Sequence, residues 1–544
     1  MPEAAPQPMS GSGRWWLAPI PLAFMLATIV LVMLCRVRLL DTPLERDEGE
    51  YAYVGQLMLQ GIAPYGTAAN MKLPGTHAAY ALIMAVFGET IRGIHLGLLL
   101  VNALCVLLVF FIAKKLFNFH SGMAAAACYA VMSVGPGVDG VWAHATHFVM
   151  LFALAGMLLI LSWASRPKPY ILILSGLSFG AAFVMKQPGI LFAVFAGLFI
   201  LCTAWQARPN NYRQAFLNLF LFGLAVTIPF DITCLILWRA GVFPQFWFWV
   251  FTYAARYVAL SSLSKGAEAF MGHTIPLITS NLGICALAVW GAVILPDKEH
   301  RPRTFLLLGF LVCSWLAVCP GLYFRDHYFI LVMPAVAILA AVVAGHTKNT
   351  LAGVLPLWAV VAGLVYSMAA QSEYLFQMGP QEAVRLVYGA SPFAGAIPVG
   401  EYIRAHSDEA DSVAVLGSEP EIFFYSRRKS ATPYLYIFPV VEPHSLTPHM
   451  QQEYIEDVES AKPKFLVFVK VANSWGLLPD SPRGLLEWGK YYYEENYDLV
   501  GVVDITPEET IAKWDADAAN YRFHSTDNMM VYRRKPVPIV MAGQ

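Results

Sequence analysis

The sequence predicts an α-helical polytopic membrane protein with about 11 transmembrane helices, followed by a C-terminal extracytoplasmic α/β domain. Of the 544 residues, 57% are apolar and only 13% are Asp, Glu, Lys or Arg, about half of the charge that a soluble protein carries. The charge is also uneven. Residues 1–370 hold 34 of the 73 charged residues, about 9% of that stretch, whereas residues 371–544 hold the other 39, about 22%.

The membrane part contains eleven apolar segments of roughly the length that a bilayer requires. They are residues 15–35, 93–113, 121–137, 146–164, 170–186, 188–205, 214–237, 275–295, 304–321, 327–345 and 351–369. If the N-terminus is cytoplasmic, the cytoplasmic connections carry Arg14, Lys114, Lys115, Arg166, Lys168, Arg208, Arg213, Lys298, Arg301, Arg303 and Lys348, whereas the short outer connection at 138–145 carries no Lys or Arg. We therefore expect a cytoplasmic tail at 1–14, a membrane domain at 15–370 and a soluble domain at 371–544 outside the cytoplasm.

Two outer segments of the membrane domain are too long or too polar to be turns. The first is about 36–92, and the second, about 238–274, is rich in Phe, Trp and Tyr. Such aromatic density is typical of a helix that lies in the membrane interface.

The C-terminal part has the pattern of a small α/β domain. It contains strand-like runs at 412–417, 464–471 and 498–504, with helical patterning at 449–461.

Composition and motifs exclude several functions. All eight cysteines lie in or beside apolar segments, which indicates neither a disulfide framework nor a Cys-based metal site. The net charge of −1 gives no basic field for nucleic acid. Neither a Gly-Lys-Ser/Thr loop nor a dinucleotide fingerprint occurs, so nothing supports ATP- or NAD-driven chemistry.

The sharpest motif is Glu45-Arg46-Asp47-Glu48-Gly49-Glu50-Tyr51, shortly after the first apolar segment. Four carboxylates beside a membrane surface are costly to desolvate unless a polar group uses them. One interpretation is a solvated loop next to the membrane. The other is a site in which one carboxylate accepts a proton from a hydroxyl nucleophile while the others orient it.

Isolated cations recur at the predicted outer ends of the apolar segments. They are Lys72 before Pro74, Lys186 before Gln187, Arg256, and Arg325 before Asp326. Singly, each is typical of a paired or snorkelling side chain. Four of them on a face that the positive-inside rule depletes indicate a membrane-embedded anionic ligand.

A divalent metal is a weaker alternative. His144 and His147 lie three residues apart, with Asp139 just before them, a spacing that can bind a metal on one helical face. A third and a fourth ligand are not evident, so we assign no metal site from the sequence.

The motif order resembles a known family. Asp47-Glu48 with Tyr51, then Lys72-Leu73-Pro74, Lys186-Gln187-Pro188, and Arg325-Asp326-His327-Tyr328 follow one another along most of 15–370. This order resembles the polytopic glycosyltransferases that use lipid-phosphate sugars: bacterial relatives of the dolichyl-phosphate-mannose protein mannosyltransferases and of the lipid A aminoarabinose transferase. The C-terminal segment is similar to the extracytoplasmic domain of a bacterial subset, on the runs Gly417-Ser418-Glu419-Pro420 and Lys464-Phe465-Leu466-Val467-Phe468-Val469.

The resemblance implies a multi-pass transferase of the inner membrane whose site faces the periplasm. It implies that Asp47 is the essential carboxylate, with Glu48 beside it, and that the lipid phosphate is held by Lys72, Arg256, Lys186 and Arg325. Supporting or acceptor-side roles fall to Tyr51, Asp139, His147, His327 and Tyr328. Many relatives have Lys-Gly-Pro instead of Lys186-Gln187-Pro188, and a second carboxylate where this chain has His144-Ala145-Thr146-His147. Asp139 or His147 is expected to replace that carboxylate.

The expected function is therefore transfer of a sugar from a polyprenyl-phosphate donor to a hydroxyl or amine of an envelope acceptor, such as protein, lipid A or polysaccharide. A direct displacement inverts the anomeric centre, as in the family, and needs one base and cations on the leaving phosphate. The alternatives are a transporter or flippase for lipid-linked sugars, for which charges near the bilayer midplane are expected, and a membrane-anchored sensor or assembly protein.

Overall fold

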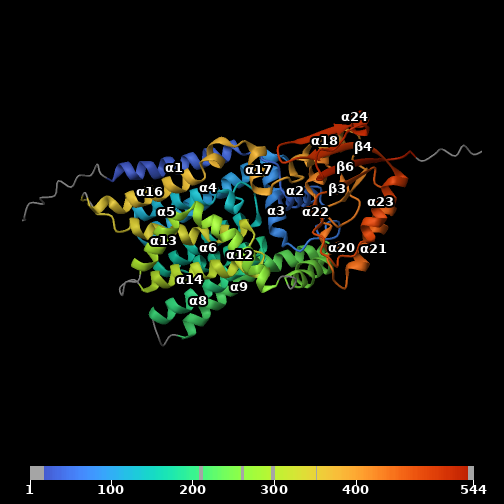
Figure 1. Ribbon diagram of the computed structural model, residues 1–544. Helices are drawn as coiled ribbons and strands as arrows, with labels where there is room; N and C mark the ends of the chain where they lie inside the picture. The colour runs from blue at the N-terminus through green and yellow to red at the C-terminus, as the bar shows by residue number, and fades with distance from the viewer. Residues whose placement is uncertain are drawn as a thin grey trace, which may run out of the picture.

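The computed structural model describes residues 18–207, 212–258, 262–295, 301–348, 350 and 352–536. A long bundle of helices forms the first part, and a smaller unit with a six-stranded sheet lies at one end of the bundle (Figure 1). The prediction of an α-helical chain with a C-terminal α/β domain is confirmed at this level. The predicted tail at 1–14 lies outside the described residues.

Each of the eleven predicted apolar segments falls on helical structure. The helices concerned are α1 (Pro19–Arg38), α4 (Ile91–Leu116), α5 (Phe119–Met132), α6 (Ala145–Ser165), α7 (Pro169–Met185), α8 (Ile190–Ala207), α9 (Tyr212–Arg239), α12 (Leu263–Ser280), α13 (Leu282–Ile294), α14 (Arg301–Val318), α15 (Met333–Ala344) and α16 (Leu355–Ala370). Within the described ranges, five helical stretches are long and apolar enough to cross a membrane, and α12 with α13 makes a sixth, bent candidate. The number of 11 crossings stays a prediction.

The short helix α5 lies at the centre of the bundle. Its residues from Ala124 to Met132 are all buried, and it packs against α1, α4, α15 and α16. Four consecutive alanines, 124–127, allow the neighbouring backbones to approach closely.

One predicted span is broken. The continuous segment expected at 275–295 is instead split between α12 and α13, which meet at an angle of 93°. The break lies at Asn281, whose φ of −121° and ψ of 26° are not helical. Its side chain is buried and donates a hydrogen bond of 3.1 Å to the carbonyl oxygen of Leu277, so that a carbonyl near the end of α12 keeps a partner.

The two long outer segments lie between the bundle and the sheet domain. The first contributes α2 (Arg46–Leu59) and α3 (Pro74–Phe87), which Figure 1 places between the two parts. The second contains a helix, as expected: α10 (Phe243–Trp247), a π-helical turn (Phe248–Tyr253) and α11 (Ala254–Val258) follow one another without a break, and its place in a membrane interface stays a prediction. Part of its aromatic surface contacts the C-terminal domain, since Trp249 packs on Tyr434 with ring centroids 6.0 Å apart.

The C-terminal domain is built on one mixed sheet with the strand order β2-β1-β3-β6-β4-β5. Its strands are β1 (Ser412–Leu416), β2 (Lys429–Ser430), β3 (Phe465–Lys470), β4 (Tyr497–Ile505), β5 (Thr510–Trp514) and β6 (Asn528–Arg534). β1 pairs in parallel with β2 and β3, and the remaining pairs are antiparallel. The predicted strands correspond to β1, β3 and β4, whereas the other three had no clear signal.

Helices surround this sheet and join it to the bundle. They are α17 (Pro380–Tyr388), α18 (Phe393–Ala405), α19 (Glu421–Ser426), α20 (Phe438–Val441), α21 (Thr447–Ala461), α22 (Ala472–Trp475), α23 (Gly484–Asn496) and α24 (Asp515–Ala519). The predicted helix at 449–461 is α21.

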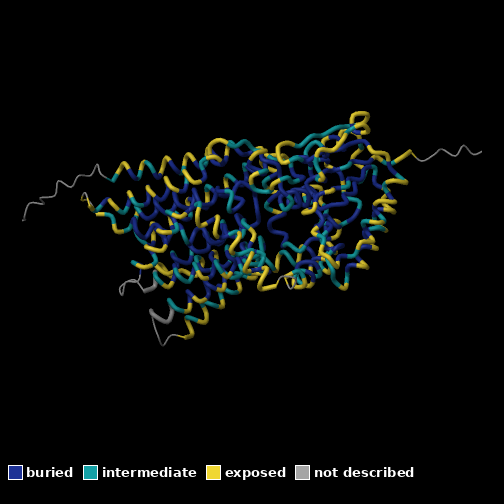
Figure 2. The backbone as a smooth tube through the Cα atoms, in the orientation of Figure 1, coloured by how far each residue is buried: buried dark blue, intermediate teal, exposed yellow. Residues whose placement is uncertain are grey.

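The helical bundle and the C-terminal domain share a continuous core. Figure 2 shows buried residues running from the bundle into the sheet domain, and a single apolar cluster includes both Val54 of α2 and Phe423 of α19. The two parts approach closely at Gly49, where an added Cβ would lie 2.6 Å from the backbone nitrogen of Glu421. Only a residue without a side chain allows α2 to contact α19 so closely.

Replacing Gly49 with alanine should therefore push α2 away from α19. We expect Gly49→Ala to lower the free energy of unfolding by about 1–3 kcal/mol, the usual cost of overpacking, measured by thermal or denaturant unfolding in detergent. Gly223→Ala in α9 is the control, because its added Cβ meets nothing within 4 Å and Ala favours the helix. Equal stability of the two variants would contradict the close contact.

Candidate active site

The acidic motif forms the first turns of α2. Glu45 is the N-cap residue, and its side chain accepts a hydrogen bond of 2.7 Å from the backbone N–H of Glu48. Carboxylates are favoured at this end of a helix by its dipole. Residues three apart share a helix face, so Asp47 and Glu50 point together, whereas Glu48 points elsewhere.

Lys72 binds both carboxylates of this face. Its Nζ lies 2.8 Å from Oδ1 of Asp47 and 2.5 Å from Oε2 of Glu50. It also lies 4.5 Å from the ring centroid of Tyr51 and donates a hydrogen bond of 3.1 Å to the hydroxyl of Tyr436. The Tyr436 hydroxyl in turn donates to Glu50 at 2.5 Å. A residue of the C-terminal domain thus completes the coordination of Lys72.

The position of Lys72 follows from the loop before α3. The backbone carbonyl of Lys72 accepts a hydrogen bond of 2.8 Å from Tyr65, and its N–H donates to Asn70 at 2.9 Å. Pro74 begins α3 two residues later, where its fixed φ suits the first turn. An added Cβ on Gly75 would lie 2.5 Å from the carbonyl oxygen of Val184, so this turn packs tightly against the end of α7.

The pKa values of neighbouring carboxyl groups in the acidic motif are shifted in opposite directions. Burial alone would raise the pKa of Asp47, but the positive charge of Lys72 holds that pKa well below its usual range. Burial, together with the charges of Asp47 and Glu48, raises the pKa of Glu45 well above its usual range. The pKa of Lys72 is raised because its two carboxylate partners outweigh burial. Asp47 is therefore an ionised carboxylate, and Glu45 favours the neutral form.

Glu48 faces the bundle instead of Lys72. It is fully buried, lies 3.2 Å from Nε2 of His95, and accepts hydrogen bonds from the Tyr80 hydroxyl at 3.5 Å and from the backbone N–H of Ala143. These contacts connect α2 to α3, α4 and the segment before α6. In this geometry Glu48 positions α2, and Asp47 is the carboxylate on the open side.

A second cluster of polar side chains, formed by His144, His327 and Asp139, lies beside Asp47. The rings of His144 and His327 are stacked, with centroids 3.9 Å apart and an angle of 11° between them. Nε2 of His144 and Nδ1 of His327 lie 3.8 and 3.5 Å from Oδ2 of Asp139. Asp139 has a left-handed φ of 51°, which Asp tolerates better than most residues. The turn at 136–144 and the segment 325–331 therefore meet at the same point.

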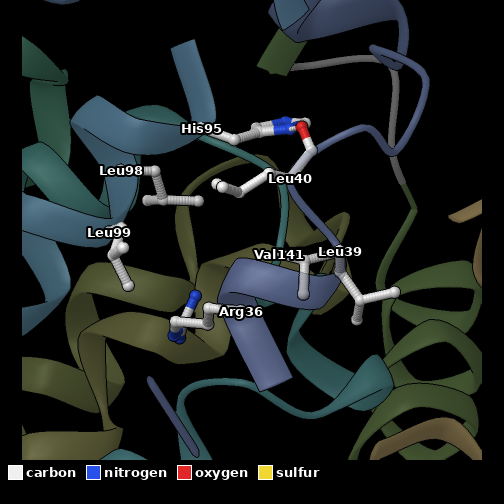
Figure 3. Close-up of a pocket in the computed structure, with 7 residues that line it drawn as sticks. All are labelled: Arg36, Leu39, Leu40, His95, Leu98, Leu99 and Val141. Carbon is white, nitrogen blue, oxygen red and sulfur yellow. Dashed lines mark hydrogen bonds between the residues drawn. The ribbon is translucent and has the colours of Figure 1, made fainter. Parts of the chain in front are cut away.

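Arg36 of α1 holds the turn that carries Asp139 and His144. Its side chain is buried and donates hydrogen bonds of 2.6 Å to the carbonyl oxygens of Gly140 and Ser133. Figure 3 shows Arg36 at the edge of a small pocket, with His95 on the opposite side beside Leu40. Because Arg36 bonds to Ser133 before the tight turn at Pro136–Val138 and to Gly140 after it, it fixes this segment against α1.

Lys186 and Arg325 provide positive charge that no carboxylate neutralises directly. Nζ of Lys186 lies 4.1 Å from the ring centroid of Tyr328, and both cations interact electrostatically with Asp47. Among the described residues, neither makes an ion pair within 4 Å. The site thus combines a lysine bound to two carboxylates with two cations that lack such partners.

Two sequence-predicted residues lie apart from this cluster in the described contacts. The guanidinium of Arg256 is exposed, and its hydrogen bond of 3.4 Å goes to Ser445 of the C-terminal domain. His147 is buried in α6. The sequence suggested His144 and His147 as a metal-binding pair. In the structure the ring of His144 stacks on that of His327 instead.

Sequence reasoning gave no individual role to four residues that the fold brings together here. Glu50 and Glu45 belong to the acidic motif, and their roles follow only from the helical period of α2. Nε2 of His77 lies 3.2 Å from Oε1 of Glu50, whereas Lys72 binds the other oxygen of that carboxylate. Tyr436 is 364 residues from Lys72 in the chain, and no local pattern marks it.

Comparisons with known proteins support the family resemblance. The family model described as dolichyl-phosphate-mannose-protein mannosyltransferase matches residues 72–233. The undecaprenyl phosphate-alpha-4-amino-4-deoxy-L-arabinose arabinosyl transferase 2 of Pseudomonas fluorescens is 25% identical over 301 residues. The match covers 49% of this chain and 46% of that protein, so it spans about half the length of this relative.

Two solved structures have a similar fold. The crystal structure of ArnT from Cupriavidus metallidurans bound to undecaprenyl phosphate has a TM-score of 0.59 and 14% identity, covering 97% of this chain and 100% of ArnT. The archaeal oligosaccharyltransferase AglB from Archaeoglobus fulgidus, in complex with an inhibitory peptide and a dolichol-phosphate, has a TM-score of 0.52 and 10% identity, covering 96% of this chain and 77% of AglB. The family resemblance predicted from the motifs is confirmed.

Removing the Arg36 side chain should loosen the turn that carries Asp139 and His144. Arg36→Met leaves the carbonyls of Ser133 and Gly140 without their donor, and we expect a loss of about 2–4 kcal/mol in the free energy of unfolding. The measurement is unfolding in detergent. Arg92→Met is the control, because its ion pair with Asp41 is exposed and contributes about 0–1 kcal/mol. If both variants unfold like the unsubstituted protein, Arg36 does not hold the turn.

Proposed function

We propose that this relative of the lipid-phosphate-dependent glycosyltransferases transfers a sugar from a polyprenyl-phosphate donor to a hydroxyl or amine of an envelope acceptor. The observation that carries the proposal is the ionised carboxylate of Asp47, which lies beside two cations without carboxylate partners, between an apolar helical bundle and a polar domain. A donor with a lipid tail and a phosphate needs such a junction, because its tail favours the membrane and its charge favours fixed cations.

Asp47 is the proposed base. An acceptor O–H or N–H must lose its proton as its oxygen or nitrogen attacks the anomeric carbon, and an ionised carboxylate can accept that proton. Lys72 keeps Asp47 ionised in spite of burial. With a single base and a direct displacement, the anomeric configuration inverts, and the sugar–phosphate bond breaks as the new glycosidic bond forms.

Lys186 and Arg325 are the proposed phosphate ligands. Negative charge grows on the departing phosphate, and fixed cations in a poorly hydrated site stabilise it. The charge of Lys72 is already shared between Asp47 and Glu50, so its contribution to the phosphate is smaller. Arg256 lies at the contact with the C-terminal domain, apart from these two cations.

The remaining predicted residues have supporting roles in this scheme. Tyr51 packs its ring against Lys72, and Tyr328 packs against Lys186. Glu48 holds α2 against the bundle. We assign the N-terminus to the cytoplasm and the C-terminal domain to the periplasm, in accordance with the distribution of Lys and Arg in the loops.

Replacing Asp47 with asparagine tests the role of the base. We expect Asp47→Asn to lower the transfer rate about 10²–10⁴-fold, while binding of a polyprenyl-phosphate donor is retained. The measurement is mass spectrometry of envelope glycans and glycoproteins in a strain without the gene, complemented by each version. Asp41→Asn is the control, because Asp41 lies in the same segment but pairs with Arg92 at the surface.

The expected result is the loss of one sugar from one acceptor, restored by the unsubstituted protein and by Asp41→Asn but not by Asp47→Asn. Full restoration by Asp47→Asn would contradict the proposed base. If a lipid-linked sugar instead changed sides of the membrane equally with both versions, the chain would be a flippase.

A further inference from the structure

A hollow in the C-terminal domain gathers basic side chains at the end of the sheet that lies away from the helical bundle. It has a volume of about 330 Å³ and lies where α21 ends, β1 and β3 begin and β6 ends. Its polar lining residues are Asp411, Ser412, Lys462, Lys464, Arg534 and Lys535. The strand β1, about 16 Å long at the usual rise per residue, separates this basic hollow from Ser418 and Glu419, which contact Arg46 of α2.

The charge of the basic hollow is opposite to the charge of its domain. Residues 371–544 contain 24 Asp and Glu but only 15 Lys and Arg, so the domain as a whole repels anions. The basic hollow nevertheless brings together four cations and a single carboxylate, that of Asp411. Cations that gather in one concave place against the net charge of the domain indicate an anionic ligand.

One of the four cations is paired with carboxylates. Nζ of Lys464 lies 2.7 Å from Oδ2 of Asp411 and 3.9 Å from Oδ2 of Asp408. In the part of the chain that the structure describes, the other three have no carboxylate oxygen within 4 Å. Their charge is therefore not cancelled by a neighbouring acid, and it is available to an anion that enters the hollow.

Neutral oxygens position two of these three cations. Arg534 donates hydrogen bonds of 3.3 Å to the hydroxyls of Tyr492 and Tyr497. Lys535 donates hydrogen bonds of 2.8 and 3.1 Å to backbone carbonyl oxygens at the end of α23, where the helix dipole offsets part of its charge. Arg534 and the exposed Lys462 are consequently the cations with the most charge to offer.

We propose that the basic hollow binds an anionic saccharide, that is, a sugar that carries a phosphate or a carboxylate. Its volume lies in the range of small-ligand sites, about 300–1,000 Å³, so it can hold more than a small inorganic ion. The cations suit the anionic group, whereas the carboxylate of Asp411 and the hydroxyl of Ser412 suit the hydroxyl groups of a sugar.

Only the origin of the saccharide rests on the proposed function, in which it is part of the envelope acceptor. The basic hollow lies at the opposite end of β1 from the contact with α2, so it would hold a long acceptor without taking part in the reaction at Asp47. The binding is measured without a donor and without transfer. Failure of the binding and failure of the transfer are therefore distinguished from each other.

Binding of small anionic sugars to the purified full-length protein in detergent is the test. The probes are glucose 6-phosphate and trigalacturonate, compared with inorganic phosphate and with the uncharged sugar maltotriose. Dissociation constants are measured by titration followed with saturation-transfer NMR. The titrations are repeated at high salt, because screening weakens the attraction between exposed charges.

The informative variants are Lys462→Asn and the double variant with Arg534→Gln. Lys462 follows the last residue of α21 with a left-handed φ of 46°, which asparagine tolerates better than lysine, so Lys462→Asn should fold well. Lys462→Arg is the matched control that keeps the charge. Lys490→Gln is a second control, because it removes an exposed charge of α23 that does not line the hollow. Unfolding temperatures establish which variants are folded.

We expect the anionic sugars to bind more tightly than inorganic phosphate and maltotriose, and to bind more weakly at high salt. Lys462→Asn should lower their affinity about threefold and the double variant about tenfold, whereas the two controls should leave it unchanged. Binding of only one of the two sugars also supports the proposal and identifies the anionic group.

Three results would overturn the proposal. The first is that neither anionic sugar binds, and the second is that Lys490→Gln loses as much affinity as Lys462→Asn. The third is that inorganic phosphate or maltotriose binds as tightly as the anionic sugars, because the hollow would then not recognise a charged saccharide.

Discussion

The ion pair between Lys72 and the Asp47–Glu50 face of α2 is the interaction on which the site depends. Asp47 is half-buried and Glu50 is fully buried. Two carboxylates this close cannot both stay ionised without a cation between them, because taking their charges out of water costs free energy. Lys72 supplies that cation, at 2.8 and 2.5 Å. Through Tyr436 the same ammonium also contacts the C-terminal domain. The loop before α3, the helix α2 and the sheet domain are therefore joined at one charged group.

The rest of the site is arranged around that pair by ordinary helix geometry and packing. The period of α2 divides one acidic motif into two faces, with Asp47 toward Lys72 and Glu48 toward the bundle. Gly49 lies between these faces and allows α19 to approach within backbone contact. Since Lys72 is bound by carboxylates, the cations available to an anionic ligand are Lys186 and Arg325. In the proposed function, Lys72 therefore keeps the base Asp47 ionised, and Lys186 and Arg325 bind the phosphate.

Much of this could be predicted from the sequence, because apolar length and charge distribution are local properties. They predicted the helical segments and three strands of the C-terminal domain, and the motif order identified the family. The pairing of residues distant in the chain could not be predicted. Tyr436 follows no motif, and His144 pairs with His327 instead of with His147 because the segment after α14 folds back onto the turn before α6. The break at Asn281 was missed because a bent span has the same hydropathy as a straight one.

The affinity for undecaprenyl phosphate, measured by competition binding on the purified protein, tests this division of roles most directly. Lys186→Gln and Arg325→Gln should each weaken binding about tenfold or more, since a charge-assisted hydrogen bond contributes about 1.5–3 kcal/mol. Lys265→Gln, on the exposed side of α12, should leave the affinity unchanged. Unaltered affinity in both Lys186→Gln and Arg325→Gln would contradict the account, because the phosphate would then be held by other groups.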